Sequence, residues 1–448
     1  MLFSKTDLIK IIIPLFIEQL LAITVGMFDS MMVSSTGESA VSGVSLVDTL
    51  NLLLIHIFTA LAGGGAVIIS QLIGKKDIDG AKKASKQLIW SVFIISTFIC
   101  TLSVAIRSPL LKLIFGSIEK DVMAHAQIYF LFTALSFPFF GIYSACSSIF
   151  RAMGDSGISM RVSLIMNVLN LGGNALLIFV FHMGAAGAAI ATLFSRIVGA
   201  LIMLLLVTNP KKQLHVNKIF SFKPDFFYIK RICSIGIPNG LENGMFQFGK
   251  VLTQSIVSSF GTMQIAANAV ANSLTSLQYV PGTAIGLSMV VIIGRCVGAG
   301  EKEQTVKYTK KLMLITYVAI WFISAILCTF SNLFIGMYSL SEQSTSIAKQ
   351  LLFFHSICVC SIWPIAFTLT NSFRAASDVK FPMFLSITSM WIFRVGLSFV
   401  LGVHFEFGVL GVWIAMFCDW VFRTIIFGVR YIKRTWLKFH FSSNYNSK

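Results

Sequence analysis

The sequence predicts an all-α membrane protein, with twelve transmembrane helices in two six-helix bundles related by a pseudo-twofold axis. Three observations support this fold class: the composition, the number of long apolar segments, and an internal repeat. Of the 448 residues, 56% are hydrophobic and only 12% are charged, and the mean hydropathy is +0.82. Soluble proteins carry about 25% charged residues. So much apolar surface requires lipid around it, which excludes a soluble enzyme and a disordered chain.

Apolar segments long enough to cross a bilayer, about 20 residues each, recur along the whole chain. We expect twelve spans, near residues 9–33, 44–72, 87–106, 122–148, 158–182, 186–208, 230–259, 265–294, 308–331, 347–372, 381–403 and 408–429. The connections between them are short, so no soluble domain is expected. The chain then divides into an N-terminal bundle, a cytoplasmic linker, a C-terminal bundle and a basic cytoplasmic tail, at residues 1–208, 209–229, 230–432 and 433–448.

The positions of the basic residues predict the orientation of these spans. If both termini are cytoplasmic, 27 of the 35 Lys and Arg residues fall in cytoplasmic segments and only 4 in outer loops. Basic residues accumulate on the cytoplasmic side of a membrane. We therefore expect a multi-pass protein of the cytoplasmic membrane with both termini inside. The net charge of +17 is explained by this topology, and nucleic acid is not expected as a partner.

The two halves of the chain repeat one another. A shift of 224 residues, or 223 in one case, aligns Pro14 with Pro238, Glu18 with Glu242, Gly74 with Gly298, IFRAMGDS (149–156) with NSFRAASD (371–378), and Gly187 with Gly411. Each half has an even number of spans, so both enter the membrane from the same side, as parallel repeats do. Channels usually assemble identical subunits around a pore, so two different bundles in one chain favour a transporter.

In its motifs and their order, the sequence resembles the multidrug and toxic compound extrusion (MATE) transporters and, among them, the DinF-like branch. The resemblance covers nearly the whole chain. It is carried by Pro14 with Asp29, SQLIGKKD, FRAMGDS, NVLNLGGNALLIF, GAAGAAIAT, GIP at 236–238, FRAASD, WIFR and GVWIAMFCDWVFR. It implies a twelve-helix transporter that exports organic compounds, coupled to inward movement of protons or sodium ions.

Two acids in the first span are candidates for ion coupling. An ionisable side chain at mid-bilayer costs at least about 2.5–3.5 kcal/mol, so it needs a partner or a function. Glu18 and Asp29 are separated by about 1100° of helix rotation, which places them near one face. The functional interpretation is a protonation or cation site, and the alternative is a pair of buried, hydrogen-bonded acids. The resemblance favours Asp29, which coincides with the acid of the family's first span.

The fifth and sixth spans supply neutral oxygen ligands. Asn170 and Asn174 are four residues apart and share a helix face, and Thr192 follows in the next span. The resemblance implies that they surround a cation site with Asp29. Relatives often carry aspartate where this chain has Asn174, which reduces the negative charge available for sodium. Carboxylate, amide and hydroxyl oxygens still suit a hard cation, so Na⁺ or H⁺ is the expected coupling ion and no other cofactor is expected. Hydrogen bonding between helices is the alternative role for the asparagines.

The seventh span is unusually polar and is the expected wall of a substrate cleft. The residues assigned to this cleft are Glu242, Gln247, Lys250 and Gln254. Lys250 could pair with a carboxylate or act as an electrostatic gate. In the last two spans, Arg394, Asp419 and Arg423 are expected to form a structural ion-pair network, because Asp419 and Arg423 are four residues apart.

The sequence therefore predicts a monomeric secondary antiporter that exports cationic, amphipathic organic compounds in exchange for protons or sodium, and not an enzyme. One alternative is a lipid-linked oligosaccharide flippase of the same superfamily, which should line its cleft with cations to hold pyrophosphate. Here Glu18, Asp29 and Glu242 outnumber Lys250, which favours the antiporter. A non-transporting scaffold or receptor is a further alternative, but it would not explain the polar residues gathered in spans one, five and seven. Uptake instead of export also stays open.

Overall fold

The computed structural model describes residues 2–116, 119–212, 214–217, 219, 221, 223–338 and 340–437. Every regular element in these ranges is helical, which confirms the all-α fold class. The chain forms two compact units: Phe3–Gly240, the N-terminal unit, and Leu241–Lys448 with Met1–Leu2, the C-terminal unit. The predicted bundle boundaries at 208 and 230 stay predictions, and residues 438–448 of the predicted tail lie outside the described ranges.

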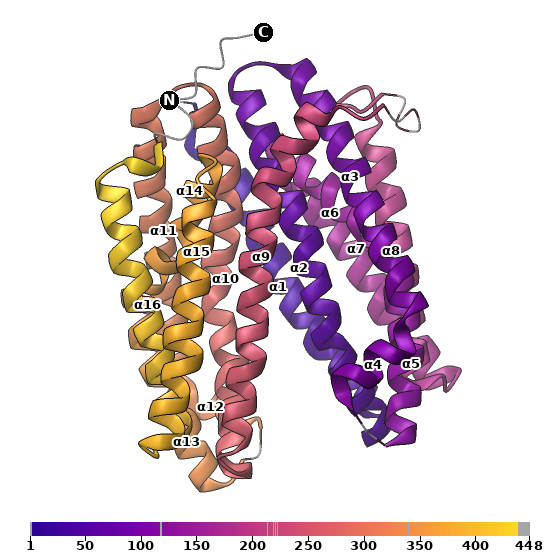
Figure 1. Ribbon diagram of the computed structural model, residues 1–448, viewed down its shortest axis with the longest axis vertical. Helices are drawn as coiled ribbons and strands as arrows, with labels where there is room; N and C mark the ends of the chain where they lie inside the picture. Colours follow the sequence, from indigo (N-terminus) through magenta and orange to yellow (C-terminus); the bar gives the residue numbers. More distant parts are fainter. Residues whose placement is uncertain are drawn as a thin grey trace. The chain divides into compact units, whose positions relative to one another are not determined.

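The N-terminal unit consists of helices that pack along one another (Figure 1). They are α1 Lys5–Ser34, α2 Glu38–Gly74, α3 Ile78–Ala105, α4 Arg107–Phe115, α5 Lys120–Leu135, α6 Phe137–Ala152, α7 Ser156–Ala175, the π-helix η1 Leu176–Val180, α8 Gly184–Val207 and the first part of α9 Phe226–Ser258. Helix α1 packs along α7, α7 packs on α8, and α2 packs on α5 and α6. These contacts bring the first, fifth and sixth predicted spans together.

The C-terminal unit begins within α9 and has the same kind of architecture. It continues with α10 Thr262–Gly298, α11 Lys302–Thr329, α12 Ser331–Gly336, α13 Glu342–Ser361, η2 Pro364–Thr368, α14 Thr370–Ala375, α15 Lys380–Ser389, η3 Met390–Leu397, η4 Val400–His404, α16 Gly408–Ile432 and the short 3-10 helix η5 Thr435–Leu437. Helix α10 packs against α11, α13 and α14, and α16 packs against the π-helices η2, η3 and η4. The sequence did not predict these π-helical segments.

The helices account for the twelve predicted spans. Within the described ranges, nine helical segments are long and apolar enough to cross a membrane. Two further spans are bent pairs, α5 with α6 at 43° and α13 with the segment Pro364–Ala375 at 58°. The seventh predicted span, residues 230–259, corresponds to α9, a helix of 33 residues.

The backbone repeats with the same offset as the sequence. Helices α2 and α10 both have 37 residues and begin 224 positions apart, and α3 and α11 both have 28 residues with that offset. The left-handed backbone positions recur as well: φ is 63° at Lys76 and 78° at Gly300. The repeat in the sequence is therefore a repeat of helix ends and turns.

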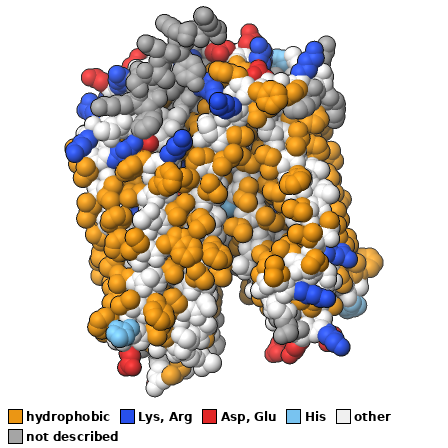
Figure 2. Space-filling model, in the orientation of Figure 1, with side chains coloured by type: hydrophobic (Ala, Val, Ile, Leu, Met, Phe, Trp, Pro, Cys, Tyr) orange, Lys and Arg blue, Asp and Glu red, His pale blue; other side chains and the backbone are white. Residues whose placement is uncertain are grey.

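Large apolar side chains are exposed on both units. Phe98 and Leu205 in the N-terminal unit, and Leu314 and Ile357 in the C-terminal unit, are among the exposed hydrophobic residues. Figure 2 shows hydrophobic side chains over most of the visible surface, with many Lys and Arg side chains near the upper end of the view. Soluble proteins rarely expose so much apolar surface to water. Helices suit a lipid environment, because each satisfies its own backbone hydrogen-bonding groups.

The leading helix of each sequence repeat contains a proline at the equivalent position. Pro14 lies inside α1 and Pro238 inside α9. Proline has no backbone N–H and its ring crowds the preceding turn, so it weakens the helix locally. These two positions are therefore the places where α1 and α9 bend most easily.

Candidate functional site

Two amides of α7 hold the carboxylate of Asp29 in α1. Asn174 Nδ2 donates a hydrogen bond to Asp29 Oδ1 over 2.7 Å. In the amide orientation that satisfies its neighbours, Asn170 donates to Asp29 Oδ1 and Oδ2 over 3.0 and 3.1 Å and accepts from Thr192 Oγ1 over 3.1 Å. The packing of α1 on α7 and of α7 on α8 therefore brings together four residues that the sequence assigned to one site.

The orientation of these amides limits what the cluster can bind. With both amide nitrogens directed at Asp29, the arrangement suits a carboxylate without a bound cation. A hard cation needs oxygen ligands. The buried Oδ1 of Asn174 has no hydrogen-bond partner among the described residues, so it is available for one. Asn170 would have to turn its amide, which would break its hydrogen bonds to Asp29.

Sequence reasoning missed a second acid, Asp48 of α2. Tyr129 Oη donates a hydrogen bond to Asp48 Oδ1 over 3.0 Å. Asp48 and Arg196 of α8 both lie close enough to Asp29 to interact with it electrostatically. Two acids and one arginine therefore lie within electrostatic range of one another. The available signal was an aspartate within the predicted span 44–72, the same signal that identified Asp29.

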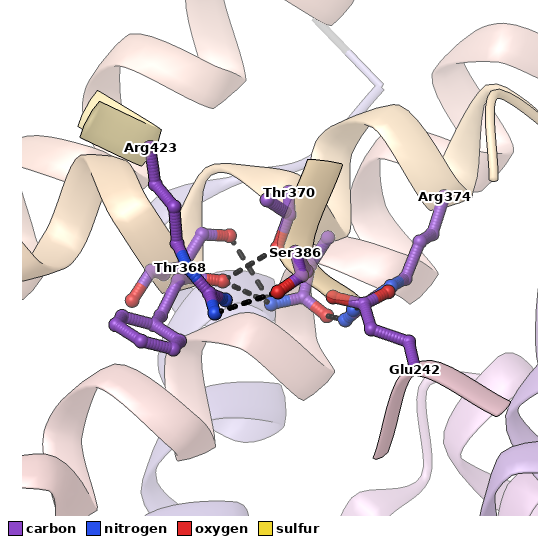
Figure 3. A network of polar contacts seen from close by, with 8 residues as sticks. Glu242, Thr368, Thr370, Arg374, Ser386 and Arg423 are labelled. Atoms are coloured by element: carbon purple, nitrogen blue, oxygen red, sulfur yellow. Dashed lines mark hydrogen bonds and ion pairs between the residues drawn. The ribbon is translucent and has the colours of Figure 1, made fainter. Parts of the chain in front are cut away.

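Glu18 and Glu242, which the sequence assigned to coupling and to the substrate cleft, each lie beside an arginine. Arg374 Nη2 is 2.8 Å from Glu242 Oε2, and Figure 3 shows the two side chains pointing toward one another from different helices. In the N-terminal unit, Arg151 Nη2 is 3.9 Å from Glu18 Oε1. Both acids are buried. The two arginines belong to the repeated FRA motifs. The sequence analysis identified these motifs but did not predict which side chains their arginines contact.

The predicted ion-pair network of the C-terminal unit is formed in part. Arg423 Nε is 2.8 Å from Asp419 Oδ1, and its Nη2 donates to the Ser386 carbonyl over 3.0 Å (Figure 3). Arg394 instead places its guanidinium 5.3 Å from the centre of the Phe246 ring. Ion pairing in the described part of this network therefore involves Asp419 and Arg423.

The remaining α9 residues have different surroundings. Lys250 Nζ lies 5.6 Å from the centre of the Phe246 ring. Gln254 Oε1 accepts a hydrogen bond from Asn268 Nδ2 of α10 over 3.2 Å, so it links two helices. Gln247 is half-buried. A role in substrate binding stays a prediction for all three.

Taken together, apolar helices in two repeated units with charged and amide groups within their spans define a polytopic membrane transporter. The sequence profile of the MatE family matches residues 14–176 and again 238–400, two ranges with the same 224-residue offset. The chain belongs to the MatE family, whose members are transporters and not enzymes.

Individual relatives match over almost their whole length. The Uncharacterized transporter YisQ of Bacillus subtilis (strain 168) is 27% identical over 432 residues, which cover 95% of this chain and 93% of YisQ. The Probable multidrug resistance protein NorM of Thermotoga maritima is 26% identical over 446 residues, with 97% and 93% coverage.

Solved structures show the same fold. A multidrug resistance MATE family transporter of the MOP superfamily in an outward-facing conformation has a TM-score of 0.87 and 19% identity, covering 96% of this chain and 95% of that one. A MOP superfamily transporter from Pyrococcus furiosus, described as having a binding pocket of reverse polarity that suggests a different function, has a TM-score of 0.87 and 18% identity, with 97% and 96% coverage.

Proposed function

We propose that the protein is a monomeric secondary antiporter that exports small organic compounds across the cytoplasmic membrane in exchange for protons or sodium ions. Both termini are cytoplasmic in this proposal, as the distribution of Lys and Arg predicts. Membership of a transporter family and relatives named as multidrug resistance proteins support organic substrates. The observation that carries the coupling is the contact of two asparagine amides with Asp29.

Asp29 is better suited to exchange a cation than Glu18 or Glu242. Its hydrogen-bond donors are neutral amides, so a proton or sodium ion can replace their contacts without leaving a partner charge alone. Protonation of Glu242 would leave the charge of Arg374, 2.8 Å away, without its partner, and an uncompensated buried charge is strongly destabilising. We therefore assign coupling to Asp29, with Asn170, Asn174 and Thr192 as its ligand partners, and treat both glutamates as parts of ion pairs.

The substrate class in this proposal is amphipathic organic cations. The two acids Asp29 and Asp48, with only Arg196 as a basic neighbour in the same interaction, support attraction of a positive group to the N-terminal unit. Binding of a coupling ion and binding of substrate then influence one another by equal free energies, because linkage between two ligands is reciprocal. An ion that neutralises Asp29 lowers the affinity for a cationic substrate.

The test is efflux of a fluorescent organic cation from proteoliposomes under an imposed pH or Na⁺ gradient. We expect the wild-type protein to respond to at least one gradient and Asp29→Asn to lose gradient-driven transport. Asp121→Asn, an identical change at the exposed start of α5, is the control and should transport normally. A wild-type protein indifferent to both gradients would exclude antiport. Unchanged gradient-driven efflux by Asp29→Asn would exclude the coupling role.

A further inference from the structure

Three basic side chains of the C-terminal unit converge on one aromatic ring. Around Phe246, the centroid of the ring lies 5.6 Å from Lys250 Nζ, 5.3 Å from Arg394 Cζ and 5.7 Å from Arg423 Cζ. Lys250 belongs to α9, Arg394 to η3 and Arg423 to α16. The packing of α16 on η3 brings together cations that are far apart in the sequence.

The described carboxylates near this cluster do not balance its charge. Within the spans of the C-terminal unit, the carboxylates are Glu242 and Asp419. Glu242 pairs with Arg374 and Asp419 pairs with Arg423. In the described ranges neither Lys250 nor Arg394 has a carboxylate within 4.0 Å. Arg394 interacts electrostatically with Asp419, but it shares this one carboxylate with Arg423, and Lys250 and Arg394 are close enough to repel each other. Two positive charges are therefore in excess.

These cations lie deep in the membrane-spanning segments. Lys250 precedes the end of α9 at Ser258 by roughly 12 Å of helix, at about 1.5 Å per residue, and Arg394 lies ten residues before the end of η4 at His404. A charged side chain at the centre of a bilayer costs at least about 2.5–3.5 kcal/mol. A cation–π contact contributes about 0.5–2 kcal/mol, and here three cations share the single ring of Phe246. An anion would offset the cost much better.

Part of the cluster is accessible, because Lys250 is exposed and Arg394 is half-buried. Lys250 is exposed on the surface of its unit, and an exposed ammonium at this depth is tolerated where it faces a water-filled cavity and not lipid. Arg394 lies in the π-helix η3 Met390–Leu397. Irregular π-helical turns are frequent at functional sites, because they redirect a side chain from the regular helical position.

We propose that Lys250 and Arg394 bind the carboxylate of an amphipathic organic ligand. The planar guanidinium of Arg394 matches a carboxylate with two parallel hydrogen bonds, and Lys250 adds a mobile point charge. Phe246 holds the two cations around one ring, while Arg423 is already engaged by Asp419 and Ser386. That this ligand is a transported compound rests on the proposed function. The inference then implies that the substrate carries a carboxylate in addition to its positive group.

The test measures binding without any ion gradient, so the result does not depend on antiport. The full-length protein is placed in phosphatidylcholine nanodiscs and titrated calorimetrically with 2-naphthoate and with its uncharged analogue 2-naphthamide. We expect the wild-type protein to bind 2-naphthoate at least tenfold more tightly. Lys250→Gln and Arg394→Gln should each lower 2-naphthoate affinity at least tenfold and leave 2-naphthamide affinity unchanged. Lys349→Gln, at a half-buried lysine that donates to Asn332 and lies far along the chain from the cluster, should change neither.

Several results would overturn the assignment. Equal affinities of the wild-type protein for the two probes would do so, and so would an unchanged 2-naphthoate affinity in Lys250→Gln. If Arg394→Gln does not fold, as judged by thermal unfolding, the exposed Lys250 still provides the test. If phosphatidylglycerol competes with 2-naphthoate in the wild-type protein but not in Lys250→Gln, the site belongs to a lipid phosphate. Asp29→Asn should retain 2-naphthoate binding while losing gradient-driven transport, which separates this inference from the proposed coupling.

Discussion

Arg374 Nη2 lies 2.8 Å from Glu242 Oε2, and at the equivalent positions of the other repeat Arg151 Nη2 lies 3.9 Å from Glu18 Oε1. In both units the acid follows a helix proline by four residues, and the arginine belongs to a repeated FRA motif. The motifs also end alike: Asp155 pairs with Lys212 over 3.0 Å and Asp378 with Arg430 over 2.6 Å. Each FRA motif therefore contacts the proline-containing helix of its own sequence repeat.

The Glu242–Arg374 pair should show strong coupling in a double-mutant cycle. Arg374→Met leaves the buried carboxylate without its partner, and we expect a loss of about 3 kcal/mol in the free energy of unfolding. Changing both residues to Met removes both charges and should recover most of that loss. Denaturant unfolding of the purified protein measures the cycle. Lys310→Met, at an exposed lysine of α11, is the control and should change stability by less than about 0.5 kcal/mol.

Additive losses in that double variant would show that the two side chains act independently. The same cycle at Glu18 and Arg151 should give a smaller coupling energy, because the separation is 3.9 Å instead of 2.8 Å and the attraction between charges falls with distance.

Asn174→Asp should make the Asp29 cluster more selective for sodium. The substitution places a second carboxylate beside Asp29, and two adjacent carboxylates repel each other unless a cation lies between them. We expect the apparent Na⁺ affinity to rise at least tenfold. The measurement is the rise in unfolding temperature on adding NaCl, compared with KCl at the same ionic strength. Asn332→Asp is the control. If Na⁺ stabilises Asn174→Asp no more than K⁺ does, sodium ligation by this cluster is excluded.

Gly64→Ala should destabilise the N-terminal unit. A Cβ at Gly64 would lie 2.7 Å from the Gly236 backbone N and 2.8 Å from the Ile232 carbonyl O, so α2 and α9 would have to separate. Overpacking of this kind costs about 1–3 kcal/mol. Gly172→Ala, also within a helix but with no atom near its Cβ position, should instead be neutral or stabilising. Thermal unfolding distinguishes the two variants, and equal unfolding temperatures would contradict the close helix contact.

Substitutions at the left-handed residue of the turns after α2 and α10 should change the stability of the protein in opposite directions. Gly300→Ala places a Cβ at φ 78°, where space is open, and should cost about 1 kcal/mol from backbone strain alone. Lys76→Gly, at φ 63° in the equivalent turn, should stabilise the protein slightly or leave it unchanged. Unfolding temperatures of both single variants test this, and a stabilised Gly300→Ala would show that the turn conformation differs.

The candidate site was predictable where the signal was local. The four-residue spacing of Asn170 and Asn174, together with the resemblance, placed both beside Asp29, and the structure has all three in contact. Asp48 carried an equally local signal and was overlooked. Arg374 could not be assigned to Glu242 from spacing, because 132 residues separate them and only helix packing decides which distant side chains meet.

The sequence by itself determined the membrane environment, the twelve spans and the duplication, because apolar length and a repeat of 224 residues are properties of the linear chain. Only the tertiary structure decided that Glu18 and Glu242 lie beside arginines. It also decided that the guanidinium of Arg394 lies over the Phe246 ring and forms no ion pair within 4.0 Å with Asp419. The π-helical turns of the last spans were likewise visible only in the structure. The reason is physical: burial requires a charge to find a partner, but the partner depends on which helices pack together and how they are rotated.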